Sequence, residues 1–487
     1  MAIPMDSFFD FTLSNDQKNA FKRVQDFTHS KENRAFILTG YAGTGKTTLV
    51  KGIVKWLESK GIDFQLTAST GRAAKVLSDS ISTKGDKNEN KVITVHSLIY
   101  KFSNLSEDLE KMHETMSNPE VDSVGQISLN FALKLAPEND KTVYLIDEAS
   151  MIGNKKRYSD SFADFGSGKL LSDLIQFDPN GKFIFIGDNY QLPPVGEKLS
   201  PALDKNYLEQ QFGLSVIKSE LHNIHRQSQE NGIVACSMNI RKCYNHYQKL
   251  INVDLYVRGY KNIVLHPNPI SLINKYLETI DINSIDESVA VCHTNRQCTD
   301  INKYVRSKLF PGQNRVQIGD RLLITQNNQK AQLVNGDLVK VSHIGTSEVR
   351  CNITFLSVKV IELQNKIEHK VLLIEDILYS GKVNIDEKKH RDLYLDYYRR
   401  MLSRGVTQKD PFFVDNLNDD PYLNALKGVF GYALTCHKTQ GGEWKEVFLY
   451  QDHHILSIPS PEIYKWWYTA ITRAKNNLHL VADGFIK

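Results

Sequence analysis

The sequence contains little that would stabilise it covalently or hold it in a membrane. Its 487 residues include six cysteines, none of which forms a Cys-x-x-Cys pair or joins histidines at zinc-binding spacing. Scattered cysteines of this kind are typical of reduced thiols in a cytoplasmic protein. No apolar run is long enough to span a bilayer, and the first ten residues lack the basic start and apolar core of a secretion signal. We therefore expect a cytoplasmic protein without a membrane partner.

The chain also lacks a strong excess of charge of either sign. Its formal net charge is +4 and its sequence pI is near 8.5, which permits an anionic partner without pointing to one. Its composition, 41% hydrophobic and 24% charged, is that of an ordinary globular protein. The length suggests about three domains.

A glycine-rich loop carries the strongest chemical signal in the sequence. Residues 40–47 follow the pattern G-x-x-x-x-G-K-T, after an apolar run at 35–38 and before a helical stretch at 49–57. Strand, glycine-rich turn and helix are the context that a phosphate-binding loop needs. The loop's backbone N–H groups and the helix N-terminus would surround phosphate oxygens. Lys46 would neutralise the β- and γ-phosphates, and Thr47 would offer its hydroxyl to Mg²⁺.

Short apolar runs alternate with helical patterns from about residue 34 to residue 222, and each run ends in a polar or glycine-containing motif. This order predicts a parallel α/β sheet with ligands at the carboxyl ends of its strands. The expected strands are Ala35–Thr39, Phe64–Ala68, Val143–Ile146 and Phe183–Ile186.

Two of these strands end in groups suited to phosphoryl transfer. Asp147 and Glu148 follow an apolar strand, so one carboxylate can hold Mg²⁺ while the other orients or deprotonates the attacking water. We assign Asp147 to the metal and Glu148 to the water. Gln191, in Gly187-Asp-Asn-Tyr-Gln, can bond both a phosphate oxygen and a water, although a structural turn would explain that segment equally well. Arg226 and Arg473 are candidates for stabilising transition-state charge, although an ordinary salt bridge is the better interpretation of an isolated arginine.

A second α/β block begins near residue 222, with expected strands at 288–293, 447–450 and 478–481. Two segments interrupt the α/β pattern. Residues 99–142 contain a polar helical stretch and an alternating segment, Ile127–Leu133, that predicts a half-buried strand. Residues 315–375 predict a small β-barrel, with a turn at Asn335-Gly336 and strands at Val316–Ile324, Asp337–His343, Val349–Leu363 and Val371–Glu375. Residues 386–420 are charged and helical, typical of a solvated amphipathic helix or, less commonly, of a nucleic-acid contact.

The ordered motifs resemble those of superfamily 1 helicases of the 5′→3′ group, the RecD/Dda type, with some likeness to Pif-type helicases. The resemblance covers nearly the whole chain, from Leu13 to Val481. The motifs that carry it are Leu13–Gln17, Gly40–Thr47, Leu66–Ala74, Thr94–Ser97, Asp147–Ser150, Gly187–Pro194, Arg226-Gln227, Val291–Arg296, Gly431–Glu443 and Tyr468–Lys475.

The resemblance implies a role for each motif. Gln17 would bond the adenine edge, Glu443 would approach the ribose, and Arg226 and Arg473 would contact the γ-phosphate. The implied ATP site comprises Gln17, Gly40, Gly43, Thr44, Gly45, Lys46, Thr47, Thr48, Gln191, Arg226, Gly442, Glu443 and Arg473, with Mg²⁺ at Thr47 and Asp147. The implied single-strand path comprises Ser69, Thr70, Arg72, His96, Ser97, Pro193, Thr294, Asn295, Arg296, Thr435, His437 and Lys438. For each residue of that path, a loop-capping hydroxyl or a satisfied core histidine is the alternative.

The expected architecture is two RecA-like P-loop NTPase domains with parallel sheets, each carrying an insertion. Residues 1–98 and 143–221 would form the ATP-binding domain, interrupted by the insertion at 99–142, whose segment Ile127–Leu133 is the candidate strand-separating pin, with Phe131 as a possible tip. Residues 222–314 and 431–487 would form the second domain, interrupted by an SH3-like barrel with a charged helical extension at 315–430.

The expected activity is an ATP- and Mg²⁺-dependent DNA helicase that moves 5′→3′ on single-stranded DNA and at junctions with duplex, as a functional monomer. Three alternatives stay open: an ATP-gated nucleic-acid-binding switch, the motor subunit of a nuclease complex, and an RNA motor, since nothing in the sequence reveals a preference for the 2′-hydroxyl.

Overall fold

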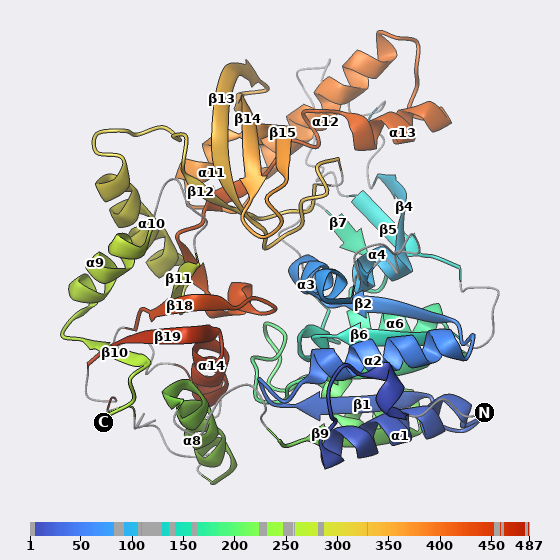
Figure 1. Ribbon diagram of the computed structural model, residues 1–487. Coiled ribbons are helices and arrows are strands. Elements are labelled where there is room, and N and C mark those ends of the chain that lie inside the picture. The colour runs from blue at the N-terminus through green and yellow to red at the C-terminus, as the bar shows by residue number, and fades with distance from the viewer. Residues whose placement is uncertain are drawn as a thin grey trace.

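The described residues form four β-sheets (Figure 1). The computed structural model describes residues 5–81, 92–105, 109, 129–135, 142–156, 163–223, 231–246, 257, 259–280, 287–328, 330–451, 458, 462–482 and 486. Two of the sheets are parallel, and each with its helices is called a lobe: lobe 1 holds the six-stranded sheet and lobe 2 a five-stranded one. An antiparallel sheet, called the inserted sheet, and a small three-stranded sheet complete the fold. The mixed α/β fold with parallel sheets is therefore confirmed.

The sheet of lobe 1 has the strand order β3-β2-β6-β8-β1-β9. All six residues of β1 are buried, as expected for a parallel strand covered on both faces. Its strands are β1 (Ala35–Gly40), β2 (Phe64–Ala68), β3 (Ile93–Thr94), β6 (Val143–Asp147), β8 (Lys182–Gly187) and β9 (Val216–Leu221). Its helices are α1 (Asn15–His29), α2 (Lys46–Ser59), α3 (Gly71–Ile81), α4 (Val95–Ile99), α6 (Leu170–Phe177) and α7 (Lys205–Phe212), and short 3₁₀ turns lie at Met5–Phe8, Ala149–Met151 and Pro201–Leu203.

The sheet of lobe 2 has the order β10-β19-β18-β11-β17, with every neighbouring pair parallel. Its strands are β10 (Ile263–His266), β11 (Ser288–Cys292), β17 (Ala433–Thr435), β18 (Trp444–Leu449) and β19 (Ala474–Val481). Its helices are α8 (Gly232–His246), α9 (Pro269–Thr279), α10 (Asn295–Leu309) and α14 (Glu462–Ile471), with a 3₁₀ turn at Cys436–Thr439.

The inserted sheet has the order β15-β14-β13-β12-β16, and a bridge between Leu373 and Leu426 joins its first strand to the segment just before its last. The sheet therefore curls toward closure, although its description as an SH3-like barrel stays a prediction. Its strands are β12 (Arg321–Ile324), β13 (Leu338–Arg350), β14 (Ile353–Glu362), β15 (Glu368–Ile374) and β16 (Gly428–Phe430), followed or interrupted by helices α11 (Glu375–Ser380), α12 (Glu387–Leu402) and α13 (Pro411–Asp419).

The structure corrects three of the strand limits expected in this sheet. Residues 316–320 precede β12 rather than belonging to it, and Glu375 begins α11. The expected strand at 349–363 is divided by a turn, because Cys351 and Asn352 adopt left-handed backbone angles with φ of 51° and 56°. The turn expected at Asn335-Gly336 is present, and Gly336 has a φ of 99°.

The small sheet combines β4 (Tyr100–Leu105), β5 (Leu129–Leu133) and β7 (Ala163–Phe165). Its third strand comes from beyond the range 99–142 expected for this insertion. Of the candidate pin, residues 127–128 lie outside the described residues. The prediction that Phe131 forms a protruding tip is wrong, because its ring stacks on that of Phe165 with centroids 4.6 Å apart.

The charged extension at 386–420 is helical, as predicted, but its apolar side is packed rather than solvated. Tyr394, Tyr397 and Tyr398 of α12 are buried in one cluster with Leu109 and with Leu105 and Leu129 of the small sheet. The backbone N–H of Leu109 also donates to Gln408 Oε1 at 2.8 Å. The extension therefore connects the inserted sheet to the small sheet beside lobe 1 (Figure 1).

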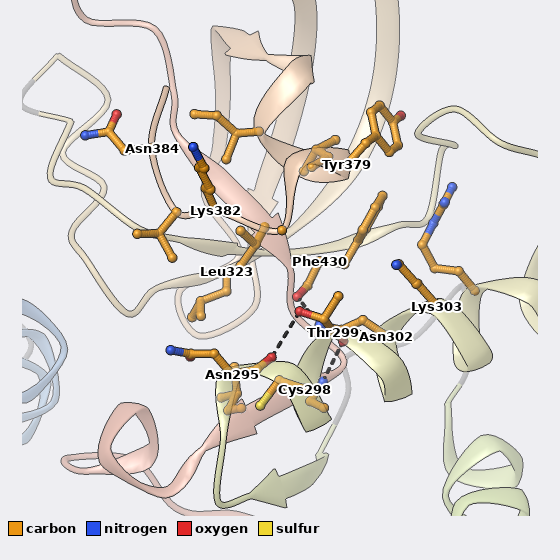
Figure 2. Close-up of a pocket in the computed structure, with 18 of the residues that line it drawn as sticks. Asn295, Cys298, Thr299, Asn302, Lys303, Leu323, Tyr379, Lys382, Asn384 and Phe430 are labelled. Atoms are coloured by element: carbon orange, nitrogen blue, oxygen red, sulfur yellow. Dashed lines mark hydrogen bonds between the residues drawn. The ribbon is translucent and has the colours of Figure 1, made fainter. Parts of the chain in front are cut away.

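The inserted sheet joins lobe 2 through a short, closely bonded junction (Figure 2). Only Gly431 and Tyr432 separate β16 from β17. Asn302 of α10 donates to Phe430 O at 2.7 Å and accepts from Ala433 N at 2.9 Å, on either side of the junction. A Cβ on Gly431 would lie 2.8 Å from the backbone nitrogen of Leu323, so no side chain fits there. The two sheets are consequently fixed to each other.

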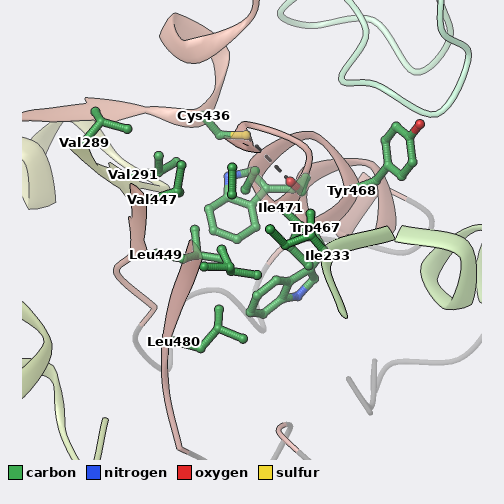
Figure 3. Close-up of a cluster of buried hydrophobic side chains, with 14 of the residues drawn as sticks. Ile233, Val289, Val291, Cys436, Val447, Leu449, Trp467, Tyr468, Ile471 and Leu480 are labelled. Atoms are coloured by element: carbon green, nitrogen blue, oxygen red, sulfur yellow. Dashed lines mark hydrogen bonds between the residues drawn. The ribbon is translucent and has the colours of Figure 1, made fainter. Parts of the chain in front are cut away.

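Helix α14 forms the centre of the lobe 2 core (Figure 3). All ten of its residues except the first are buried, among them Trp467 and Ile471, which pack with Val291 and Leu449 of the sheet. Burial on every side fixes α14 in place, so the polar groups at its lobe 1 side are held rigidly.

No helix in the described part of the chain is long and apolar enough to cross a membrane.

Candidate nucleotide and nucleic-acid site

A cavity of about 790 Å³ lies where lobe 1, lobe 2 and the inserted sheet meet. The glycine-rich loop and the carboxylate pair form its lobe 1 side, and Asp337, Glu362 and Leu363 of the inserted sheet contribute a third wall. Most residues predicted for ATP or Mg²⁺ line it: Gly43, Gly45, Lys46, Thr47, Thr48, Asp147, Glu148, Gln191, Gly442, Glu443 and Arg473.

The glycine-rich loop has the backbone shape that phosphate binding needs. Gly43 and Gly45 have φ angles of 82° and 78°, which L side chains rarely adopt. Lys46 begins α2, and its Nζ donates to the carbonyl oxygens of Gly40 at 2.6 Å and Tyr41 at 3.0 Å. The ammonium is therefore held at the helix N-terminus, where a phosphate would be favoured by charge and by free backbone N–H groups.

The two carboxylates at the end of β6 are partly buried, and the charge of Asp147 acts on Glu148. Burial raises the pKa of Glu148 to about 7, with the Asp147 charge acting in the same direction and Arg473 and Lys46 opposing it. Burial also raises the pKa of Asp147, against the backbone N–H of Glu148 and the charge of Lys46. Glu148 has a left-handed φ of 50°, a conformation uncommon for a residue with a side chain.

The donor set fits Mg²⁺, although the described residues hold no cluster of three metal-binding His, Cys, Asp or Glu side chains. Mg²⁺ usually takes one or two carboxylates and completes its octahedron with water and substrate phosphates. Asp147 and the Thr47 hydroxyl line the same cavity as Lys46, so they would supply the protein oxygens. Mg²⁺ would neutralise developing phosphate charge there.

Gln191 has an acceptor without a partner at this site. The side chain is 4% exposed, and its Oε1 is buried and accepts no hydrogen bond within the protein. A buried polar atom without a partner in a cavity calls for an explanation such as a ligand or an ordered water. This observation fits the predicted contact of Gln191 with a water or a phosphate.

Tyr468 of lobe 2 reaches across the seam to lobe 1. Its hydroxyl donates to Asp188 Oδ2 at 2.7 Å and accepts from the backbone N–H of Ala42, in the glycine-rich loop, at 3.0 Å. Next along α14, Thr469 Oγ1 accepts from Leu192 N at 2.9 Å. These bonds connect α14 to the phosphate-binding loop and to the segment after β8.

Arg473 lies at the seam, as predicted, with a 4% exposed side chain. In this structure its donors are used within lobe 2: Nε to Thr469 O at 3.0 Å, Nη1 to Gly442 O at 3.1 Å and Nη2 to Thr472 Oγ1 at 3.2 Å. Its charge is felt by Glu148, whose pKa it lowers against the effect of burial. A γ-phosphate contact would require these bonds to be shared or exchanged.

Three of the described residues predicted for the nucleotide do not line the cavity. Arg226 lies outside the described residues, so its predicted contact stays untested. Gln17 braces the loop instead, since its Nε2 donates to Thr44 O at 3.0 Å and its Oε1 accepts from Ser14 N at 3.0 Å. Gly40 contributes its carbonyl to Lys46, and Thr44 donates its hydroxyl to Tyr41 O at 2.9 Å.

Two of the residues predicted for nucleic acid lie at equivalent helix N-termini. Thr70 precedes α3 and accepts from Ala73 N at 3.2 Å, and Thr294 caps α10 and accepts from Gln297 N at 3.2 Å. Each helix follows the carboxyl end of a parallel strand, β2 in lobe 1 and β11 in lobe 2. Helix N-termini favour phosphate groups, so the capping role of these threonines is compatible with a backbone contact.

A second cavity, of about 1340 Å³, lies beside the lobe 2 helix N-terminus (Figure 2). Asn295, Thr435 and Lys438, all predicted for nucleic acid, line it together with Lys303 and Lys382. Burial lowers the pKa of Lys438. The cavity continues from lobe 2 to the loop after α11, which belongs to the insertion.

The remaining predicted contacts are divided between the lobes. Pro193 and His437 line a third cavity, of about 680 Å³, and Arg296 is exposed on α10. His96 packs against Tyr100 and Phe165, and Ser97 is exposed at the start of α4. Ser69 Oγ is buried and has no partner. Arg72 is the exception, because it lines the nucleotide cavity with Lys46 and Glu148.

Sequence reasoning missed several residues of the seam. Lys75 of α3 donates to Asp337 at 2.6 Å and to Glu362 at 3.1 Å, and both acids have side chains less than a tenth exposed. These contacts join residues more than 260 positions apart, so no local sequence pattern predicts them. Asp188 and Tyr468 stood inside recognised motifs but were given no role.

Comparisons with known proteins find similar proteins over most of the chain. A family model described as an AAA domain matches residues 12–249, and one described as a UvrD-like helicase C-terminal domain matches residues 430–481. The ATP-dependent DNA helicase Dda of Enterobacteria phage T4 is 24% identical over 90% of this chain and 92% of its own length. The RecBCD enzyme subunit RecD of Buchnera aphidicola is 23% identical over 93% of this chain and 72% of its own. A crystal structure of a Bacteroides Pif1 helicase with ADP-AlF3 and ssDNA superposes with a TM-score of 0.48 and 16% identity, covering 98% of this chain and 94% of that one.

Proposed function

We propose that this chain is a superfamily 1 helicase of the RecD/Dda type that unwinds duplex DNA by moving 5′→3′ along one strand at the expense of ATP. The observation that carries this proposal is the cavity at the seam. It brings Lys46, the Asp147-Glu148 pair and Arg473, from two lobes of one chain, to a single nucleotide-sized space. A complete site in one chain favours a functional monomer.

Hydrolysis in this cavity needs positioning and charge more than covalent chemistry. Lys46 and the loop's N–H groups hold the phosphates, and Thr47 and Asp147 supply oxygens for Mg²⁺. Glu148, with a pKa near 7 in the free protein, is suited to orient a water and accept its proton. Gln191 offers its unpartnered Oε1 to the same water. Arg473 would stabilise the transition-state charge from lobe 2.

The single strand would cross both lobes at their helix N-termini. Thr70 and Thr294, at the starts of α3 and α10, would contact backbone phosphates, and such contacts position a strand without reading its sequence. The cavity lined by Asn295, Thr435 and Lys438 would continue the path toward the insertion. Exchange of grip between the lobes, driven by opening and closing of the seam, would produce directed movement.

Duplexes with single-stranded 5′ or 3′ tails test this function directly. We expect unwinding of 5′-tailed substrate with Mg²⁺ and ATP, none with Lys46→Ala, and, with Glu148→Gln, ATP binding without turnover. An undiminished hydrolysis rate for Glu148→Gln in the presence of DNA would show that the catalytic assignment is wrong.

The same assay separates the alternatives. DNA-dependent ATP hydrolysis without unwinding of either tail would favour a nucleic-acid-binding switch, or a motor that needs the partners of a nuclease complex. Unwinding of the 3′-tailed duplex alone would reverse the polarity. Matched RNA tails would reveal a preference for the 2′-hydroxyl.

A further inference from the structure

Arg72 crosses the seam between the lobes. It comes from the first turn of α3 in lobe 1, yet its guanidinium carbon lies 4.4 Å from the ring centroid of Trp444 in lobe 2. A Cβ added to Gly442 would lie 2.7 Å from both that carbon and the Trp444 ring. Lobe 2 therefore fixes the guanidinium against an aromatic face and an unsubstituted backbone, as stacked arginines require.

The hydrogen bonding of this guanidinium is incomplete. Arg72 Nη1 is buried and has no hydrogen-bond partner. Burial lowers the pKa of Arg72 to about 10, the nearby Arg473 charge acts in the same direction, and Asp337 opposes it. Asp337 itself directs Oδ2 to Lys75 and to the backbone N–H of Val334. A buried cationic donor without an acceptor is costly, and an anion in the cavity would relieve that cost.

Two other cations of the cavity, Lys46 and Arg473, differ from Arg72 in this respect. Lys46 Nζ donates to two loop carbonyls, and each of the three nitrogens of Arg473 donates within lobe 2. Arg72 thus has a donor open in the present arrangement, in the same cavity as Lys46 and Glu148.

We propose that Arg72 binds a phosphate oxygen of ATP. Lobe 1 supplies this guanidinium, and Trp444 of lobe 2 positions it. This inference rests on the proposed ATPase site and assigns Arg72 to the nucleotide instead of to the DNA strand. Arg72 follows Thr70, the expected DNA contact, by two residues, so one short segment would contact both ligands. Nucleotide binding would then change the position of the lobe 1 DNA contact directly.

Binding measurements on the full-length chain can separate the two ligands. Fluorescence titration with mant-ATP and Mg²⁺, without DNA, reports the nucleotide, and anisotropy of labelled oligo(dT), without nucleotide, reports the strand. We expect Arg72→Gln to weaken mant-ATP binding at least tenfold and to keep oligo(dT) affinity within twofold. Arg72→Lys should recover part of the loss, because it keeps the charge but not the planar fork. Trp444→Leu should weaken mant-ATP binding in the same direction.

Arg296 provides the matched comparison. Arg296 lies two residues after Thr294 in the first turn of α10, just as Arg72 lies two residues after Thr70 in the first turn of α3. Unlike Arg72, Arg296 is exposed. We expect Arg296→Gln to weaken oligo(dT) binding and not mant-ATP binding. If Arg72→Gln instead behaves like Arg296→Gln, or changes neither affinity, the inference is overturned. Should Arg72→Gln fail to fold, Arg72→Lys decides by the same comparison.

Lys46→Ala distinguishes this inference from the proposed function. Normal mant-ATP binding by Lys46→Ala would contradict the nucleotide site itself. Loss of binding by Lys46→Ala with normal binding by Arg72→Gln would contradict only the role of Arg72.

Discussion

Removing one hydroxyl at the seam should weaken ATP binding without altering any group expected to touch ATP. Tyr468→Phe deletes the donor to Asp188 Oδ2 and the acceptor for Ala42 N–H. Tyr468 and Asp188 are each 1% exposed, so water cannot readily replace these bonds. A hydrogen bond to a buried carboxylate contributes about 1.5–3 kcal/mol and one between neutral groups about 0.5–1.5 kcal/mol.

The closed seam should therefore lose about 2–4 kcal/mol, which corresponds to a shift of about 30- to 1000-fold toward the open form. The apparent affinity for a ligand falls with the fraction of protein in the binding-competent form. We expect the KM for ATP in DNA-stimulated hydrolysis to rise at least tenfold. The kcat should fall less, because the groups expected to act on the γ-phosphate remain.

Tyr464→Phe is the matched control, one helical turn earlier on the same buried helix. It removes the same atom from an equally buried tyrosine of the lobe 2 core, away from the phosphate-binding loop. Only Tyr468→Phe should raise KM, because only its hydroxyl bonds across the seam. An unchanged KM in Tyr468→Phe, or equal KM values in the two variants, would refute the assignment of this hydroxyl to closure.

Two further predictions concern buried charge. Lys75→Met should lower the free energy of unfolding in urea by about 3–5 kcal/mol, because it leaves Asp337 and Glu362 buried without their shared cation. Adding Asp337→Asn to this variant should restore part of the lost stability. If the double variant recovers none of it, the pairing of Lys75 with Asp337 is contradicted. Burial, aided by the charge of Lys427, lowers the pKa of His390 well below its usual value, so below about pH 6.5 the unfolded chain binds a proton that the folded chain does not. The unfolding free energy of the native chain should then fall relative to that of His390→Gln by up to about 1.4 kcal/mol per pH unit, and parallel pH profiles would contradict this.

The sequence predicted the four inner strands of the lobe 1 sheet well, because they are apolar runs that end in distinctive motifs, but it missed the edge strands β3 and β9. Ala35–Gly40 and Val143–Asp147 agree with expectation to within one residue at their ends. The turn at Cys351 and Asn352 was missed since neither glycine nor proline marks it, and both residues adopt a left-handed backbone that local sequence does not announce.

The candidate site was predictable where one segment holds several of its groups, and not where the lobes meet. The P-loop and the carboxylate pair line one cavity, as expected. The resemblance assigned Arg72, with the other residues of its motif, to the DNA strand, but its contact with Trp444 depends on packing between segments more than 370 residues apart. The cavity wall formed by Asp337 and Glu362 could likewise not be predicted from the sequence, because it exists only after the inserted sheet folds against α3.

The two-residue junction between β16 and β17 determines how force would pass through the molecule. Asn302 clamps the chain on both sides of Gly431, and the absence of space for a side chain there leaves no slack in the linkage. We therefore expect the inserted sheet to move with lobe 2, and its ion pairs with Lys75 are one of its contacts with lobe 1. Separation of the lobes would then have to break those buried ion pairs, so the strength of the pairs would contribute to the free energy required to open the seam.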